Sequence, residues 1–126
     1  MSVVLDAGAL LAIERGDRRI AAVLKVELAA GRSPRTHGGV IGQVWRGGTG
    51  RQARLAKALQ GAEIVAIDDA LGRRVGILLG HSGGADVIDA GIVLIADDGD
   101  EVFTGDRADL HDLAAAAGRQ IDLVDV

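Results

Sequence analysis

The apolar positions of the chain form short unbroken runs that alternate with longer segments of helical spacing. Four short runs end at an acidic residue or a glycine, which predicts buried strands. These predicted strands cover residues 2–5, 63–67, 101–104 and 121–124. The predicted helices cover residues 9–14, 18–30, 40–46, 51–59, 69–79, 86–96 and 107–117. Loops are predicted over residues 32–37, around the single proline Pro34, and over residues 81–84.

Strands that are apolar along their whole length are typical of a parallel sheet covered by helices on both faces. The alternation of strands and helices predicts an α/β fold class. We expect a three-layer α/β/α domain with a short central parallel sheet of four or five strands. No internal repeat, low-complexity tail or linker interrupts the 126 residues. Residues 1–126 are therefore predicted to form a single domain.

The composition limits the classes of protein that fit. Apolar residues make up 48% and charged residues 25%, so intrinsic disorder is not expected. Cysteine is absent, which excludes disulfides and thiolate sites and fits a reducing compartment, so we expect a cytoplasmic protein. No apolar run approaches the roughly 18 residues that span a bilayer, and Asp6 follows the first run at once, so neither a membrane span nor a signal peptide is expected. The aromatic content of 2% weakens any interpretation based on base-stacking platforms.

The formal net charge of −4 is unevenly distributed. Residues 14–74 hold twelve basic and six acidic side chains, whereas residues 75–126 hold eleven acidic and two basic ones. Such a bipolar layout can hold a polyanion at one place and a cation at another. Charge asymmetry alone favours the alternative that both blocks are solvated helix faces.

Acidic residues follow the predicted strands. Asp6 directly follows the first strand, and Asp106 follows the third strand after Gly105. Asp89 lies in the first turn of an apolar helix. Because ligands of parallel sheets bind outside the carboxyl ends of the strands, these acids are expected to converge there. We therefore select Asp6, Asp89 and Asp106 as the candidate catalytic and metal-binding residues.

Two pairs of acids stand at helix starts with a spacing of three residues, Asp86 with Asp89 and Asp106 with Asp109. That spacing places each pair on one helix face. Several carboxylates in one cleft resist ionising until a cation enters, and Mg²⁺ is the natural occupant because it takes oxygen ligands. The structural alternative is that these acids, and Asp6, cap helices and complement their dipoles. For each aspartate taken singly, that alternative stays open.

Four short segments resemble the motifs of PIN-domain ribonucleases, in the order and spacing of that family. They are Val-Val-Leu-Asp-Ala-Gly-Ala-Leu at 3–10, Val-Ile-Gly-Gln-Val-Trp-Arg-Gly-Gly at 40–48, Asp-Ala-Gly-Ile-Val-Leu-Ile-Ala at 89–96, and Phe-Thr-Gly-Asp at 103–106 with the acid–apolar pair 109–110. The resemblance spans nearly the whole chain. Length, order and spacing are most similar to those of VapC-type toxins of toxin–antitoxin pairs.

The resemblance implies a PIN-like fold and a metal-dependent endoribonuclease that cuts single-stranded or loop RNA, such as transfer RNA. It implies that Asp6, Asp89 and Asp106 bind Mg²⁺ or Mn²⁺, with Asp109 and Asp86 as auxiliary acids. It further implies a homodimer and inhibition by a small cognate antitoxin protein that inserts near the acidic cleft.

Two further residues of the implied site are not acids. Thr104 would orient a carboxylate or a water through its hydroxyl. The family's second motif usually offers Glu, and here that position is Gln43. An amide oxygen can ligate a metal or hold a water, but it brings no charge and no base. The site then runs on fewer charges, which we favour, or another acid such as Glu14 compensates, or the protein is an altered nuclease.

Basic side chains flank a glycine-rich stretch beside the proposed site and are candidates to contact RNA phosphates. They are Arg46, Arg51, Arg54 and Lys57. Arginine suits bidentate phosphate contacts, which position a backbone and do not read its sequence. An exposed basic helix is the alternative for each. The histidines are expected in loops or on helix surfaces and none is assigned to a metal, and Trp45 is assigned to the core or a dimer interface.

Other α/β classes fit less well. A response-regulator receiver needs a lysine near a late strand, but both lysines, Lys25 and Lys57, lie earlier. A haloacid-dehalogenase-type phosphatase needs a second acid two positions after Asp6, and Gly8 stands there. No Walker-type glycine-lysine motif occurs, which excludes P-loop chemistry. The remaining rival is a catalytically weak PIN-like module that binds RNA or a partner.

Overall fold

The computed structural model describes residues 1–47 and 50–126. Residues 48 and 49, which belong to the second motif and the glycine-rich stretch, lie outside the described residues. The described part forms five strands, seven α-helices and one 3-10 helix. In chain order these are β1 (Val3–Leu5), α1 (Ala7–Glu14), α2 (Arg18–Ala29), β2 (Arg35–His37), α3 (Gly38–Val44), η1 (Gly50–Gln52), α4 (Ala53–Gln60), β3 (Glu63–Val65), α5 (Asp69–Ser82), α6 (Val87–Ile95), β4 (Glu101–Thr104), α7 (Arg107–Ala117) and β5 (Asp122–Asp125).

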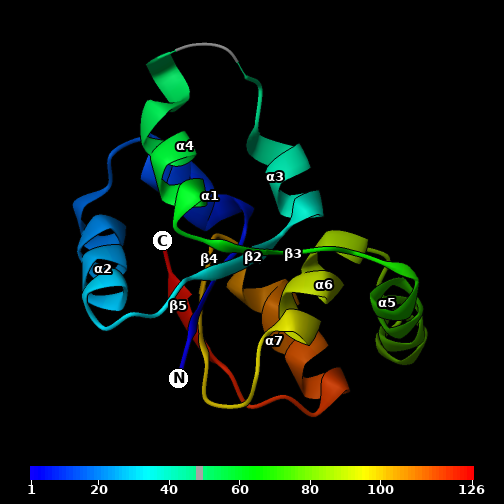
Figure 1. Cartoon of the computed structure of the whole chain (residues 1–126). Coiled ribbons are helices and arrows are strands. Elements are labelled where there is room, and N and C mark those ends of the chain that lie inside the picture. The colour runs from blue at the N-terminus through cyan, green and yellow to red at the C-terminus, as the bar shows by residue number, and fades with distance from the viewer. Residues whose placement is uncertain (48–49) are drawn as a thin grey trace.

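The five strands form one parallel sheet in the order β3-β2-β1-β4-β5 (Figure 1). β1 is the central strand and pairs with β2 on one side and with β4 on the other. Its three residues, Val3–Leu5, are all buried. A parallel strand with both faces covered has to be apolar on both, which is why this run is unbroken. The predicted α/β class and parallel sheet are confirmed, with five strands.

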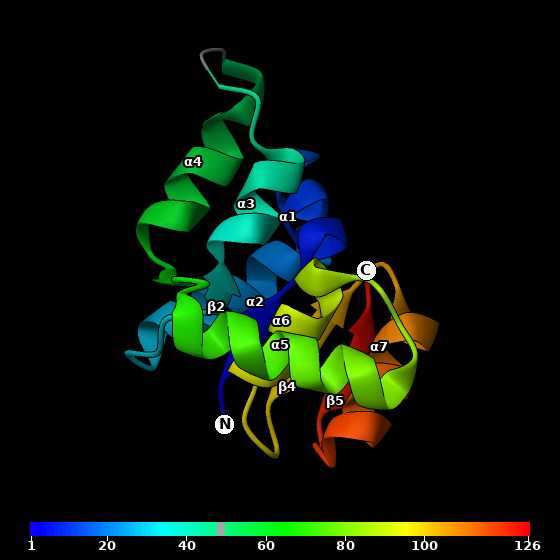
Figure 2. The ribbon, with the colours of Figure 1, turned by 90° about the vertical axis from the view of Figure 1, so that its right-hand side faces the viewer.

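Helices cover both faces of the sheet and give three layers. Helices α5, α6 and α7 pack against one another on one side of the sheet. Helix α1 contacts α2, α3 and α4 on the other side (Figures 1 and 2). This three-layer α/β/α arrangement is the predicted one.

Helix α6 is enclosed by the sheet and its neighbouring helices. Ala90, Ile92 and Val93 have no exposed surface, and α6 contacts β1 and β2. Within the described residues, no single helix is long and apolar enough to cross a bilayer. Among the described residues, α5 and α6 together have the length and apolar composition of a membrane span, but the two helices are bent by 109° relative to each other.

The loop predicted over residues 32–37 is wrong, because these residues include β2, between β1 and β3. Thr36 and His37 are fully buried although they are polar, so hydrophobicity carries no signal of a strand here. Pro34 directly precedes the strand, where its missing N–H removes no hydrogen bond of the ladder. The strand places His37 in the interior, so its expected position in a loop is also wrong.

Several helix boundaries differ from the prediction by a few residues because caps and turns set them. The helix predicted from Arg51 begins as the 3-10 turn η1 and continues as α4. Helix α5 extends through Ser82 into the predicted loop 81–84 and ends at Gly83, whose φ is 75°. Left-handed backbone of this kind ends many helices and favours glycine.

The loops after β1 and β4 come into backbone contact at Gly8. A methyl group at Gly8 would lie 2.7 Å from the nitrogen and 2.8 Å from the Cα of Gly105. Asp6 joins the same two segments, because its Oδ1 accepts from the N–H of Ala9 at 3.0 Å and its Oδ2 accepts from the N–H of Gly105 at 3.3 Å. Because Gly8 has no side chain, the segment that carries Asp6 can lie close to the segment that carries Asp106.

Replacing Gly8 by alanine is expected to destabilise the fold by about 1–3 kcal/mol, because the new methyl group meets backbone that cannot rotate away. The matched control is Gly76→Ala on α5, where, apart from the neighbouring backbone of the same helix, no atom of the described residues lies within 4 Å of the new methyl group. That control is expected to stabilise by about 0.5–1 kcal/mol through helix propensity. Thermal unfolding of both variants measures the difference, and equal midpoints would contradict the close approach at Gly8.

Candidate metal centre at the carboxyl edge of the sheet

The connections between strands change direction at β1 and β4. The chain passes from β1 to β2 and β3 on one side and then to β4 and β5 on the other. Open α/β sheets bind ligands at such a switch point, outside the carboxyl ends of the strands. Asp6 directly follows β1, and Asp106 follows β4 after Gly105. The two acids therefore end neighbouring strands, as predicted.

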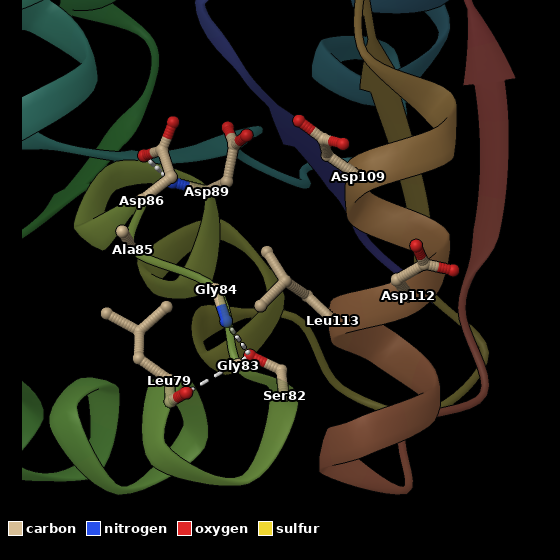
Figure 3. Close-up of a pocket in the computed structure, with 10 residues that line it drawn as sticks. All are labelled: Leu79, Ser82, Gly83, Gly84, Ala85, Asp86, Asp89, Asp109, Asp112 and Leu113. Atoms are coloured by element: carbon tan, nitrogen blue, oxygen red, sulfur yellow. Dashed lines mark hydrogen bonds between the residues drawn. The ribbon is translucent and has the colours of Figure 1, made fainter.

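Three carboxylates meet at this point, those of Asp89, Asp106 and Asp109. One oxygen from each lies within 4.8 Å of the other two. Asp89 comes from the first turn of α6, Asp106 directly precedes α7, and Asp109 lies in the first turn of α7. Figure 3 shows the carboxylates of Asp89 and Asp109 turned toward the same opening from two helices. Two of the three candidate ligands thus converge, and the predicted auxiliary acid Asp109 joins them. We call these three residues the acidic triad.

Asp106 stands at the N-cap position of α7, but its side chain makes no capping hydrogen bond. Its own N–H donates to the Oγ1 of Thr104 at 2.7 Å. The buried hydroxyl of Thr104 therefore orients the residue that carries the carboxylate, acting through the backbone. The capping alternative is wrong for Asp106, whose carboxylate stays directed at Asp89 and Asp109.

Asp6 lies beside the triad but is not one of its three members. It is 4% exposed, and both of its carboxylate oxygens accept from backbone N–H groups, those of Ala9 and Gly105. The capping alternative thus describes what Asp6 does in this structure. The negative charge of Asp6 still repels the carboxylate of Asp89 and contributes to its raised pKa. A metal-binding role for Asp6 stays a prediction.

Asp86 is the cap of α6. Its Oδ1 accepts from the N–H of Asp89 at 3.0 Å, which closes the first turn of the helix. The side chain is exposed at the rim of the site, and its negative charge raises the pKa of Asp89. Asp86 thus holds Asp89 in place and adds to the local negative potential.

The gathered charges change the acidity of two members of the triad. The pKa of Asp89 is raised to about 7, first by burial and then by the negative charges of Asp86, Asp106, Asp6 and Asp109. The pKa of Asp109 is also raised, first by a hydrogen bond shared with the carboxyl group of Asp106 and then by the charge of Asp106. A bound cation would offset the same repulsion, so the field at the triad favours cation binding.

A pocket of about 230 Å³ opens beside the triad (Figure 3). Leu79 and Leu113 form apolar walls, and Asp89 and Asp109 line it as well. Since a water molecule occupies about 30 Å³ in the liquid, the pocket admits several waters or part of a ligand next to the carboxylates.

Gln43 does not line this pocket. It is exposed on α3 and lines a separate hollow of about 500 Å³ with Glu14, Arg46 and Arg51. Glu14 is already engaged, because its Oε1 accepts from the Nε2 of Gln52 at 2.6 Å. The glutamine of the second motif and the acid expected to compensate for it therefore share a surface that is distinct from the acidic pocket.

The four predicted RNA-contacting residues divide between two surfaces. Arg46 and Arg51 line the hollow beside Gln43, whereas Arg54 and Lys57 line a more apolar groove between α2 and α4. The guanidinium of Arg46 donates to three backbone carbonyls at the end of α3. The next residue back, Trp45, is 39% exposed, so its assignment to the core is wrong and an interface role stays a prediction.

Gln52 is a buried residue to which the sequence interpretation gave no role. Its amide nitrogen donates to Glu14 and to the carbonyl of Val44, and its amide oxygen accepts from the N–H groups of Arg46 and Gly47. These four contacts of one side chain tie α1, α3 and α4 together. A single glutamine in a basic helical segment carries no pattern that would have revealed this.

No protein-family model matches this chain, and no curated protein matches it. The resemblance to PIN-domain ribonucleases therefore rests on the four sequence segments. The function of the protein has to be inferred from its own geometry and chemistry.

Replacing Asp89 by asparagine is expected to stabilise the metal-free protein in a pH-dependent way. Because the folded-state pKa of about 7 lies above the ordinary pKa of an unfolded aspartate, the wild type loses stability as the pH rises from about 4 to about 7. An asparagine side chain does not titrate, so the variant escapes this loss.

The gain is expected to be near zero at about pH 4 and on the order of 1 kcal/mol at about pH 8, after a discount for solvent screening. Thermal unfolding in the presence of a chelator measures it. Asp112→Asn is the control, since it removes a charge from the same pocket outside the triad. A stability difference that does not vary with pH would contradict the raised pKa of Asp89.

Proposed function

We propose that this chain is a metal-dependent endoribonuclease with a PIN-like fold. The observation that supports the proposal is the convergence of Asp89, Asp106 and Asp109 at the switch point of an all-parallel sheet. Repulsion between these acids destabilises the fold, and Asp106 makes no capping hydrogen bond in return. Groups held together against their own repulsion in a cleft are typical of a functional site.

The donor set fits a hard divalent cation. Carboxylate oxygens are the ligands that Mg²⁺ and Mn²⁺ prefer. Asp89, Asp106 and Asp109 would hold the ion, and Asp6 and Asp86 would add negative charge behind them. When bound, such an ion lowers the pKa of a water and stabilises the charge that develops at a phosphorus atom.

Before an ion binds, the carboxyl groups of Asp89 and Asp109 tend to stay protonated. The raised pKa values of Asp89 and Asp109 mean that both carboxyl groups retain protons to a higher pH than an ordinary aspartate does. A bound cation would displace these protons, so the affinity for the ion should rise as the pH increases toward the pKa of Asp89. Thr104 and Asp86 meanwhile fix the backbone from which the triad projects.

Basic side chains supply contacts to the RNA backbone. Arg46 and Arg51 border the hollow beside Gln43, and Arg54 and Lys57 extend the basic surface along α4. Contacts of this kind neutralise phosphates without reading the base sequence. The low aromatic content also disfavours recognition by base stacking. Single-stranded or loop RNA, such as transfer RNA, is the proposed substrate.

The sequence resemblance extends the proposal to a biological role. The chain would be the toxin of a type II toxin–antitoxin system, act in the cytoplasm as a homodimer, and be inhibited by a small cognate antitoxin protein. A catalytically weak PIN-like module that binds RNA or a partner is the second candidate. Gln43 favours it, because an amide supplies neither a charge nor a base where the family usually has Glu.

The purified protein is expected to cleave single-stranded RNA when Mn²⁺ or Mg²⁺ is present and to stop when the metal is chelated. Asp89→Asn and Asp106→Asn should each slow cleavage by about 100-fold or more, because each removes a charged ligand of the ion. Asp6→Asn should also slow cleavage, because it removes negative charge behind the triad and a carboxylate that holds the backbone of Ala9 and Gly105. Gel-based cleavage assays measure these rates.

Asp112→Asn is the matched control, because it removes the same charge from α7 outside the triad. It should keep the cleavage rate within about threefold of the wild type, as expected for an exposed charge. RNA binding without metal-dependent cleavage would favour the second candidate. Cleavage that survives both triad substitutions would refute the assignment of the active site.

If the second motif contributes to the ion's site, as the resemblance implies, replacing Gln43 by glutamate tightens Mn²⁺ binding by about tenfold. The separate hollow that Gln43 lines in this structure predicts no change instead. Isothermal calorimetry measures the affinity. Gln60→Glu, at an exposed position at the end of α4, adds the same charge elsewhere and should leave the affinity unchanged. Equal affinities of the wild type and the Gln43 variant would show that Gln43 does not contact the ion.

A further inference from the structure

His37 is a fully buried residue that connects β2 with α3 and α6. Its Nδ1 accepts from the N–H of Gly39 at 3.1 Å and thereby caps α3. Its Nε2 lies 2.9 Å from the carbonyl oxygen of Ile88, in the first turn of α6. A carbonyl oxygen can only accept, so Nε2 carries the proton and donates it. One neutral tautomer therefore satisfies both contacts, and burial lowers the pKa of His37 in agreement with a neutral ring.

The carbonyl that His37 holds belongs to the peptide group between Ile88 and Asp89. The N–H of that same peptide group donates to the Oδ1 of Asp86 at 3.0 Å. A peptide group is planar and rigid, so the imidazole at one end and the capping carboxylate at the other hold the whole unit. Asp89 projects directly from this unit. Of these two hydrogen bonds, only the one from His37 links this unit to the sheet, so moving Asp89 relative to β2 strains that hydrogen bond.

Gly91 makes room for the imidazole ring. A side chain at position 91 would begin 2.8 Å from the Nε2 of His37, and the three atoms nearest to that point all belong to the His37 ring. A glycine inside a helix weakens it relative to alanine. At position 91 the glycine is needed for the His37 contact, since any larger residue would push the ring away from Ile88.

We propose that His37 is a positioning residue of the acidic triad. Through the Ile88–Asp89 peptide group it holds Asp89 at the place where its carboxylate meets those of Asp106 and Asp109. This inference rests on the proposed metal centre and extends it to a residue outside the four motif segments. His37 touches neither the ion nor the RNA in this arrangement. The competing explanation is that His37 only caps α3 and fills the core.

Asparagine and glutamine at position 37 separate the two roles, because they replace different ring nitrogens. Asparagine is a good cap whose side-chain oxygen can replace Nδ1, but it is too short to reach Ile88. Glutamine is longer, and its amide nitrogen can replace Nε2 as the donor to Ile88. We expect His37→Asn to weaken Mn²⁺ binding by about tenfold and His37→Gln to recover most of that loss. Calorimetric titration with Mn²⁺ measures both.

Ile20→Ala controls for lost stability, since Ile20 is buried on α2 and that helix packs on α1. It should lower the melting temperature while leaving the Mn²⁺ affinity unchanged. A purely structural role predicts that His37→Asn behaves like this control. Wild-type affinity in His37→Asn, or no gain in His37→Gln over His37→Asn, would overturn the positioning role.

Amide hydrogen exchange tests the same hydrogen bonds without any metal. His37→Asn should speed the exchange of the Asp89 amide by about tenfold relative to the Val102 amide in β4, and His37→Gln should not. If the wild type binds no Mn²⁺ while the two variants show this exchange pattern, the proposed metal centre is refuted and the positioning of Asp89 is retained. Unchanged exchange at Asp89 in His37→Asn would refute the positioning role, whatever the metal titration shows.

Discussion

Repulsion between carboxylates at one edge of the sheet is the constraint on which the site depends. All strands of a parallel sheet leave it at the same edge, so the acids that follow β1 and β4 become neighbours. Asp6 and Asp86 are stabilised there by backbone N–H groups. Asp89 and Asp109 instead have raised pKa values and hold protons more tightly. The first two acids cap helices and fix the backbone, and the acidic triad is the part of the site that we propose binds a cation.

The hydrophobic pattern is sufficient to predict the centre of the sheet and the place of its acids. Runs such as Val3–Leu5 are apolar on every face, which is typical of a parallel strand covered on both sides. The hydrophobic pattern does not predict β2, because Thr36 and His37 are buried polar residues. The partners that make His37 acceptable in the interior come from α3 and α6. Gly39 is two positions away, but Ile88 lies 51 positions along the chain, and local sequence does not reveal a contact at that separation.

Spacing alone cannot separate the acids that cap helices from those that join the acidic triad. Asp86 and Asp106 each precede a second acid by three positions at a helix start, yet only Asp86 makes the capping hydrogen bond. The backbone differs, with ψ at 101° for Asp86 and 59° for Asp106. Thr104, at the end of β4, holds the N–H of Asp106 in that conformation. The distinction thus arises from how β4 ends, which periodicity does not encode.

The pairing of β1 with β4 has a consequence for the order of assembly. Val3 pairs with Glu101, and Asp6 bonds to Gly105 at a separation of 99 positions. Contacts between such distant segments form only after the entropy of closing a long loop has been overcome, which slows folding. During translation, the edge of β1 that pairs with β4 therefore stays unpaired until β4 has left the ribosome. A nascent fragment that stops before β4 contains no complete triad, so the proposed metal centre cannot form until the start of α7 has been synthesised.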